Sequence, residues 1–342
     1  MTAEIRVAAF TAGIAAPSAR FRLRQFSGPL GVHGIRVMEH VAPLGTFPPR
    51  NKPIRPFWAV ASIVSRAPSV LRSWSADVTF FQREMLSTFM TLEPFTRRPR
   101  VLDVDDAIYL HRGGHFARRI ANRCDLTLCG NDYLAEQFGK WSQRIEVLPT
   151  AVDSDQLQPR SPGVNVDSDK VVIGWIGTSA NHQYLRLLES ALSIVFASNP
   201  GASLLVVSDR DPGLALEPER VTFRRWSEVN EVADIQSMDV GVMPLADTPW
   251  ARGKCSFKML QYMSCAIPVV VSPVGMNAQV LSQGAVGFAA SSTSDWVDAI
   301  TALVRDLAQR RSMGAMGREV VQARYSIHAI APRLEAAIRS VT

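Results

Sequence analysis

The sequence predicts an α/β protein built from two Rossmann-like doubly wound domains that face a cleft. Short apolar runs ended by Gly or Asp alternate with longer helical stretches, which is the pattern of consecutive βαβ units. Many of the runs are continuous in Val, Ile and Leu, as expected of parallel strands buried on both faces. The length of 342 residues suits two domains. The active site is expected where the carboxyl ends of the strands meet the cleft.

Each half of the chain holds about six expected strands. The helical stretches that stand out are residues 183–196, 256–264, 293–313 and 327–341. The expected strands are Ile5–Phe10, Ile35–His40, Val78–Gln82, Val101–Val104, Leu126–Cys129, Ile145–Leu148, Val171–Ile176, Ser203–Val207, Val221–Phe223, Val240–Met243, Val269–Val271 and Ala285–Ala289.

A segment rich in Pro, Asp and Ser separates the two halves. Residues 149–170 lack a periodic apolar pattern and form the best linker candidate in the chain. The predicted domains are therefore residues 1–160 and 161–325, followed by a terminal segment, 326–342. A second Pro- and Arg-rich stretch, Pro48–Pro56, is interpreted as a surface loop.

Composition excludes several classes of protein. With 47% hydrophobic and 20% charged residues, the chain is neither disordered, collagen-like nor a coiled coil. Its four cysteines show no CxxC motif or zinc spacing, which argues against a metal cluster or a disulfide framework. No run of 18 apolar residues and no signal peptide are seen, so a cytoplasmic protein is expected.

The positive charge is unevenly distributed. Residues 1–160 hold 21 Lys and Arg against 14 Asp and Glu, whereas the rest of the chain is close to neutral. The basic residues are spread rather than striped and no nucleic-acid-binding motif is present, so nucleic acid is not an expected partner. The basic half is better suited to a peripheral contact with an anionic membrane.

The most informative segment is residues 252–274, which reads RGKCSFKMLQYMSCAIPVVVSPV. It predicts a Gly-containing loop, a short helix and a buried strand, with Lys254 just before the helix and Lys258 in its first turn. Two cations at a helix start, where the macrodipole favours anions, indicate a phosphate site. The alternative is a pair of solvated lysines without a role.

This segment resembles the signature of retaining GT-B glycosyltransferases of the group 1 (family 4) class. The resemblance runs from Gly253 through Gln261 to the Pro268–Val270 strand start, and it is looser over residues 1–150. It implies that Ser256 and Phe257 also contact a nucleotide-sugar donor. In that family two acids stand eight residues apart, and here they fall on Gly253 and Gln261.

The two departures from the family pattern have different consequences. An amide at Gln261 still donates and accepts hydrogen bonds, as contact with the donor ribose requires. Gly253 offers no side chain to the donor sugar, although a similar sub-branch with a G-K-C element places a lysine next to it, here Lys254.

Other donor contacts are expected upstream. Gly177 and Thr178 follow a strand and open a helix whose N–H groups face an anion, opposite the diphosphate in the resembled family. Arg225 and Trp226 end another strand, where the family places the nucleotide base, although Trp226 as ordinary core is an equal alternative. His182 is more simply an incidental histidine.

Two candidates for the chemistry lie in the first half. Asp105 and Asp106 follow a buried strand, and the resemblance places them near the reacting sugar, where a carboxylate stabilises oxocarbenium-like charge or positions an acceptor hydroxyl. One alternative is a DxD metal site of the other glycosyltransferase fold, GT-A. The other is a helix N-cap, which explains one of the two residues.

The loop after the first strand carries a basic cluster. Gly13 allows a tight backbone near the cleft, and Arg20 and Arg24 are expected on one helix face, where they meet an anionic acceptor or the donor phosphates. A solvated basic helix face is the ordinary alternative.

The expected activity is transfer of a sugar, with retention, from a nucleotide-diphosphate donor to a saccharide or lipid-linked acceptor. Residues 1–160 would then bind the acceptor, residues 161–325 the donor, and the terminal helix would pack back on the first domain, as the resemblance implies. No metal and no cofactor are expected, because Lys254, Lys258 and helix dipoles stabilise the leaving diphosphate. The alternative is a non-catalytic nucleotide or sugar-phosphate binding protein on the same scaffold.

Overall fold

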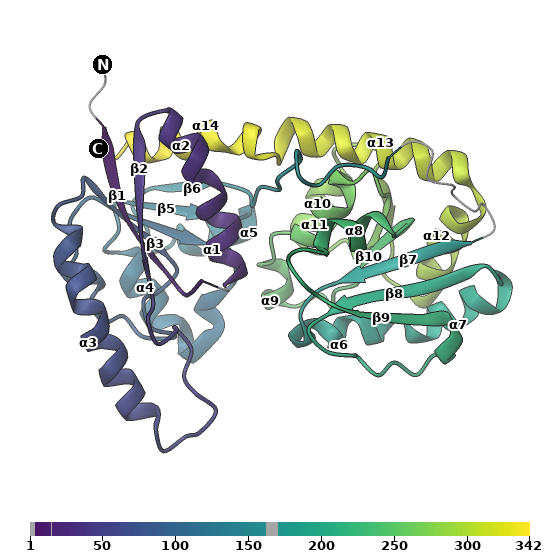
Figure 1. The fold of residues 1–342 in the computed structure, drawn as a ribbon, viewed down its shortest axis with the longest axis horizontal. Coiled ribbons are helices and arrows are strands. Elements are labelled where there is room, and N and C mark those ends of the chain that lie inside the picture. Colours follow the sequence, from purple (N-terminus) through teal and green to yellow (C-terminus); the bar gives the residue numbers. More distant parts are fainter. Residues whose placement is uncertain (1–3, 15, 162–169) are drawn as a thin grey trace. The chain divides into compact units, whose positions relative to one another are not determined.

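Two six-stranded parallel sheets form the centres of two structural units (Figure 1). The computed structural model describes residues 4–14, 16–161 and 170–342. The first unit comprises Met1–Ala151, Gly253–Cys255 and Ile327–Thr342, and the second comprises Val152–Arg252 and Ser256–Ser326. The predicted fold class, two Rossmann-like doubly wound domains, is confirmed.

The first sheet has the strand order β2-β1-β3-β4-β5-β6, and every pair is parallel. The order reverses between β1 and β3, and such a switch point is where open α/β sheets bind ligands. The elements of this unit are β1 (Ile5–Thr11), α1 (Pro17–Arg22), α2 (Ser27–Val32), β2 (Ile35–Val41), α3 (Arg55–Ser73), β3 (Val78–Gln82), β4 (Arg100–Val104), α4 (His115–Ala121), β5 (Leu126–Cys129), α5 (Asp132–Phe138), β6 (Ile145–Val147) and α14 (Ile327–Arg339).

The second sheet has the order β12-β11-β10-β7-β8-β9, with its switch point between β7 and β10. Its strands are parallel throughout. The elements are β7 (Val171–Ile176), α6 (His182–Leu185), α7 (Glu189–Ser198), β8 (Ala202–Ser208), β9 (Val221–Arg225), α8 (Glu231–Gln236), β10 (Val240–Met243), α9 (Pro249–Arg252), α10 (Phe257–Ser264), β11 (Val269–Val271), α11 (Met276–Leu281), β12 (Gly287–Ala289), α12 (Thr293–Arg305) and α13 (Leu307–Arg324).

All twelve expected strands are present, five of them with the expected bounds: β3, β5, β7, β10 and β11. The helices are less regular than expected. The single helix expected over residues 293–313 is wrong, because the chain turns out of helical geometry at Asp306, whose carboxylate accepts a hydrogen bond from the Gln309 N–H and starts α13. The helix expected over residues 183–196 is divided into α6, a 3-10 turn and α7.

Part of the expected linker packs against the second unit. Leu157 is buried, its carbonyl accepts a hydrogen bond from the Ser264 hydroxyl, and Arg160 pairs with Asp239 at 2.8 Å. Residues 162–169 of the expected linker lie outside the described residues. Residues 152–161 therefore belong to the second unit by their contacts, and the predicted domain boundary between residues 160 and 161 stays a prediction.

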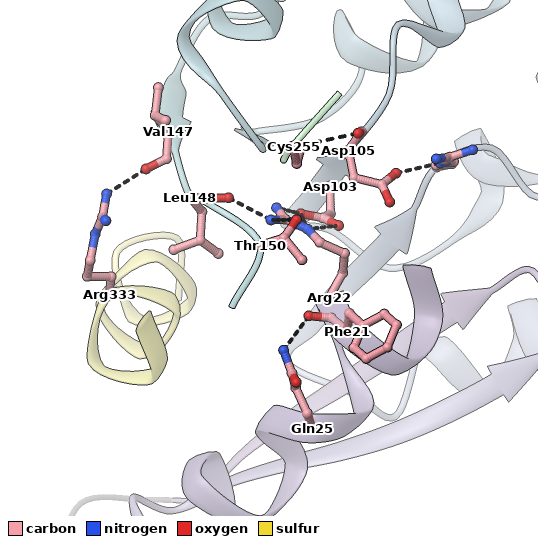
Figure 2. A network of polar contacts seen from close by, with 11 residues as sticks. Phe21, Arg22, Gln25, Asp103, Asp105, Val147, Leu148, Thr150, Cys255 and Arg333 are labelled. Atoms are coloured by element: carbon pink, nitrogen blue, oxygen red, sulfur yellow. Dashed lines mark hydrogen bonds and ion pairs between the residues drawn. The ribbon is translucent and has the colours of Figure 1, made fainter. Parts of the chain in front are cut away.

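The C-terminal helix α14 belongs to the first unit. Ile330, Leu334 and Ile338 recur every four residues on one face and are buried in that unit's core. Arg333, on another face, donates a 2.6 Å hydrogen bond to the Val147 carbonyl of β6 (Figure 2). No helix within the described ranges is long and apolar enough to cross a membrane.

A buried ion pair fixes the carboxyl edge of the first sheet. Arg22, the last residue of α1, pairs with Asp103 of β4, and neither side chain is more than 2% exposed. The same guanidinium donates to the Leu148 carbonyl at 2.6 Å and to the Thr150 hydroxyl at 3.3 Å (Figure 2). Burial alone would lower the pKa of Arg22, but the Asp103 carboxylate raises it above its ordinary value.

We expect Arg22→Met to lower the free energy of unfolding of the first unit by about 3–5 kcal/mol, because it leaves a buried carboxylate without its cation. Urea unfolding followed by circular dichroism measures the change. The matched control is Arg6→Met, which breaks the exposed Arg6–Asp77 pair and should cost below about 1 kcal/mol. Equal effects of the two substitutions would contradict the prediction.

Candidate functional site

In the second unit, Lys258 reaches back over the end of β7. A Cβ at Gly177 would lie 2.5 Å from the Lys258 Nζ, so the lysine occupies the space that a side chain at residue 177 would need. The same ammonium lies 4.4 Å from the ring centroid of the buried Trp175, a cation–π contact. Lys258 is the second residue of α10, so a positive charge is held at this helix start, beside the sheet's switch point.

Hydrogen bonds within the second unit hold two side chains near Lys258, those of Tyr262 and Ser256. The Tyr262 hydroxyl accepts a 2.9 Å hydrogen bond from the Ile176 N–H at the end of β7. Ser256, buried in a left-handed conformation, donates to Asn277 at 2.6 Å, so its proton is engaged within the protein. Phe257 begins the helix and is half-buried.

The structure brings a carboxylate to Gln261. This glutamine is 3% exposed, and its amide donates to Glu231 of α8 at 3.2 Å. The indole of Trp226, which is 40% exposed, donates to the same carboxylate oxygen at 3.4 Å. Sequence reasoning missed Glu231, because no motif marks a glutamate 30 residues before Gln261. Arg225, the last residue of β9, directly precedes Trp226 in the chain and is exposed.

The loop after β7 is closed by the chain's own carboxylate, which corrects the expectation that its N–H groups face a bound anion. Asp209 accepts from the Ser179 N–H at 2.6 Å and from its hydroxyl at 2.8 Å. Thr178 accepts a hydrogen bond from Asn181 at 3.0 Å and does not cap the turn with its side chain. His182 is buried and bonded to Ser208.

In the first unit, one arginine holds the two aspartates after β4. The Arg83 Nε lies 2.6 Å from Asp105, and a second nitrogen of the guanidinium pairs with Asp106. Arg83 has a φ of 63° and directly follows β3, and sequence reasoning did not identify it. Neither aspartate is a helix N-cap, because that position falls on Ala107 and carries no side-chain bond.

Burial raises the pKa of Asp106, although Arg83 and Lys254 oppose the rise. Asp106 therefore takes up a proton more readily than an exposed aspartate does. No group of three or more His, Cys, Asp or Glu side chains among the described residues is arranged as a metal site.

The tripeptide Gly253–Cys255 lies in the first unit, against the same aspartates. Asn131 donates a 2.9 Å hydrogen bond to the Lys254 carbonyl, and the Cys255 thiol donates to the Asp105 carbonyl at 3.2 Å. Lys254 is therefore grouped with the two aspartates, whereas Lys258 lies in the second unit. Lys254 stands three residues before α10 and Lys258 is the second residue of that helix, and the expectation that both lysines serve one phosphate at this helix start stays a prediction.

Close packing explains the missing acid at Gly253. A Cβ there would lie 2.8 Å from the Cβ of Ala107 and 2.9 Å from its backbone nitrogen. No side chain fits without a shift of the Ala107 backbone, so a glutamate at this position is excluded by the local packing.

The basic cluster of the first loop is divided. Helix α1 ends at Arg22, so Arg20 and Arg24 do not share a helix face. Arg24 pairs with Glu39 at 2.7 Å and also bonds the Gly13 carbonyl. Nothing lies within 4 Å of a Cβ built at Gly13, so the packing does not require glycine there. Arg20 lies over the ring of Phe21.

Buried polar atoms without partners stand near the switch point of the first sheet. Gln82, the last residue of β3, is 1% exposed, and neither of its amide atoms finds a hydrogen-bond partner among the described residues. One carboxylate oxygen of Glu84 is in the same condition. Because buried polar groups are normally paired, a ligand hydroxyl is a natural partner for them.

We expect Gly253→Ala to destabilise the protein by about 1–3 kcal/mol, because the new methyl overpacks the contact with Ala107. Thermal unfolding monitored by circular dichroism measures the change. Gly28→Ala in α2, where nothing lies within 4 Å of the new Cβ, serves as the control and should be neutral or stabilising by up to about 1 kcal/mol. An unchanged melting temperature for Gly253→Ala would contradict the packing explanation.

A comparison with protein families finds a match over much of the second unit. Residues 170–306 match the family described as Glycosyl transferases group 1. No curated protein matches the chain in sequence.

Solved structures with the same fold cover nearly the whole chain. Sucrose-phosphate synthase from Thermosynechococcus elongatus is 16% identical with a TM-score of 0.73, over 98% of this chain and 99% of its own. Anabaena HepE in complex with UDP-glucose is 16% identical with a TM-score of 0.67, over 98% and 100%. WaaG, a glycosyltransferase involved in lipopolysaccharide biosynthesis, is 12% identical with a TM-score of 0.66, over 98% and 99%.

At these identities the structural likenesses establish the fold, and the family match points to the chemistry. The alternative of a non-catalytic binding protein is not favoured. The match of residues 170–306 to the glycosyl transferases group 1 confirms the predicted enzyme class, a glycosyltransferase, and the solved structures confirm the GT-B scaffold.

Proposed function

We propose that this glycosyltransferase moves a sugar from a nucleotide-diphosphate donor to a saccharide or lipid-linked acceptor, with retention of configuration and without a metal or a cofactor. The observation that carries the proposal is the position of Lys258, whose ammonium lies against Gly177 at the end of β7 and in the first turn of α10. A cation at a helix start, beside a sheet's switch point, suits a diphosphate.

Lys258 supplies what the leaving group needs. As the bond from the sugar's anomeric carbon to the β-phosphate oxygen breaks, negative charge grows on the diphosphate, and the ammonium stabilises it in place of a metal ion. The new bond, from the acceptor hydroxyl oxygen to the anomeric carbon, forms on the face from which the leaving group departs, and the hydroxyl proton passes to the departing phosphate oxygen. In the transition state the sugar ring carries positive charge and resembles an oxocarbenium ion.

Gln261 and Glu231 are suited to the ribose. Their hydrogen-bonded pair offers a carboxylate, which accepts from hydroxyl groups, at the place where the family's second acid would stand. Trp226 lies against the same carboxylate and presents an exposed ring to a base, with Arg225 beside it. HepE has been solved with UDP and with UDP-glucose, so UDP is the first nucleotide to test.

The first unit is proposed to bind the acceptor. Asp105 and Asp106, held by Arg83 and accompanied by Lys254, would orient an acceptor hydroxyl and face the developing positive charge. Gln82 offers two unpartnered polar atoms to such a hydroxyl. Arg20 stays the proposed contact for an anionic acceptor, whereas Arg24 is engaged by Glu39.

The excess of basic residues in the first half of the chain supports a peripheral location at a membrane. We propose that the enzyme is cytoplasmic and makes a peripheral contact with the inner face of an anionic membrane, where a lipid-linked acceptor would lie. The support is the excess of seven basic over acidic residues in the first 160 positions.

We expect Lys258→Ala to lower kcat/KM for the donor by at least about 100-fold, because it removes the cation that stabilises the departing diphosphate. Lys254→Ala should also lower it. Transfer from a nucleotide sugar measures both, after a thermal-shift screen of nucleoside diphosphates has identified the nucleotide. Lys140→Ala, which removes an exposed lysine bonded to Gln137, is the control. Full transfer and donor binding in both site variants would refute the proposal.

We expect Glu231→Gln to weaken binding of UDP by about tenfold, because ribose hydroxyls lose a charged acceptor. Calorimetry with UDP and with 2′,3′-dideoxy-UDP separates this cause from a structural one. The dideoxy compound lacks both hydroxyls, so its affinity should be the same in the variant and the wild type. An equal loss for both ligands would assign Glu231 to packing instead.

A further inference from the structure

Helix α3 of the first unit is turned with its apolar side outward. The α3 stripe, defined as Phe57, Val60, Val64, Leu71 and Trp74, repeats at intervals of three, four, seven and three residues, so it follows one face of the helix. Its five side chains are 58–78% exposed. Figure 1 shows α3 along an outer edge of the drawing of this unit.

The opposite face of α3 is buried, and three of its four buried residues are polar. Ser62, Arg66, Val70 and Ser73 face the unit. Arg66 donates to the His40 carbonyl at 2.9 Å and to the Thr11 carbonyl at 2.8 Å, while burial lowers its pKa to about 10. These bonds fix the rotation of the helix, so the stripe is outward because Arg66 is anchored inward.

The stripe continues beyond the helix. Trp74 donates its indole N–H to the Phe95 carbonyl at 3.0 Å, and the Phe95 side chain is itself 64% exposed. Ile54, just before the helix, and Phe47 in the preceding loop are also exposed. An exposed apolar helix face that extends through Trp74 to Phe95 is typical of an interaction site, in contrast to scattered single apolar residues.

The charge around the stripe is of one sign. Between Glu39 and Asp77 the chain contains no acidic residue and five basic ones. Four of these are exposed. Arg50 and Lys52 lie in the segment before α3, Arg55 is its first residue, and Arg72 lies in its last turn.

We infer that the α3 stripe docks on an anionic lipid bilayer, with α3 lying in the plane of the interface. The combination of apolar and aromatic side chains on one face with flanking cations is what interfacial helices use, burying the apolar face at the acyl boundary while the cations meet anionic headgroups. A second copy of the chain fits less well, because a symmetric contact would place like charges against each other. This inference names the surface for the proposed peripheral contact.

Flotation with vesicles tests the inference. The wild type should bind vesicles of equal parts phosphatidylglycerol and phosphatidylcholine, bind less at high salt, and bind weakly to phosphatidylcholine alone. V64E/L71E should lower the affinity for the mixed vesicles by at least about tenfold, because it places two charges in the apolar face. The control V32E/V229E alters two exposed valines elsewhere and should bind like the wild type.

A second pair of variants tests the charge. R50Q/K52Q should weaken binding to the anionic vesicles, whereas R118Q/R119Q, which removes two exposed arginines of α4, should have a smaller effect. Vesicles with brominated acyl chains should quench the fluorescence of the wild type more than that of W74F.

Two results would overturn the inference. One is wild-type binding by V64E/L71E, and the other is a stable dimer in analytical ultracentrifugation that V64E/L71E dissociates, which would make the stripe a contact between copies. UDP binding is measured on every variant, and it should be unchanged because the stripe lies outside the proposed donor site. Loss of vesicle binding with UDP binding intact therefore bears on the surface alone, whereas absence of UDP binding in the wild type bears on the proposed function alone.

Discussion

The first unit depends on the buried pair of Arg22 and Asp103. Two opposite charges without access to water are tolerated only when each is paired and hydrogen-bonded, so the pair specifies where α1, β4 and the chain after β6 meet. The consequences reach the candidate site. The Asp103 carbonyl accepts a hydrogen bond from the Arg83 N–H at 3.0 Å, and Arg83 in turn holds Asp105 and Asp106. The Arg22–Asp103 pair therefore helps to position the carboxylates of Asp105 and Asp106, through Arg83.

Residues 252–274, on which most of the sequence analysis depends, contribute to both structural units. Three residues, Gly253–Cys255, belong to the first unit, and Lys258 belongs to the second. Gly253 is compatible with its place because nothing larger fits against Ala107. The acid that the family pattern leads one to expect there has no room, and Asp105 and Asp106 already supply carboxylates next to the tripeptide. Loss of the acid is therefore a property of local packing and does not by itself argue against catalysis.

The strands could be predicted because those in the middle of each sheet, such as β3, β4 and β10, are buried on both faces and leave short continuous apolar runs between turn residues. The helices were harder. Asp306 breaks a stretch whose periodicity continues across it, and the break depends on one carboxylate bonding one N–H. In the site, Lys258 was identifiable because the motif around it is local. Glu231 and Arg83 were not, since each meets its partners through the fold and has no fixed spacing from them in the sequence.

Helix α3 shows why a pattern of hydrophobic residues does not state which side faces the core. Its periodicity is that of an ordinary amphipathic helix, and the usual rule would bury Phe57, Val64 and Leu71. The rule fails because Arg66 donates hydrogen bonds to backbone carbonyls inside the unit. These bonds hold the Arg66 face of α3 inward, so the apolar face is left in contact with water. Contact between the apolar side chains of the stripe and water costs free energy. A bilayer that covers the stripe removes this cost, and would therefore stabilise the helix orientation that Arg66 imposes.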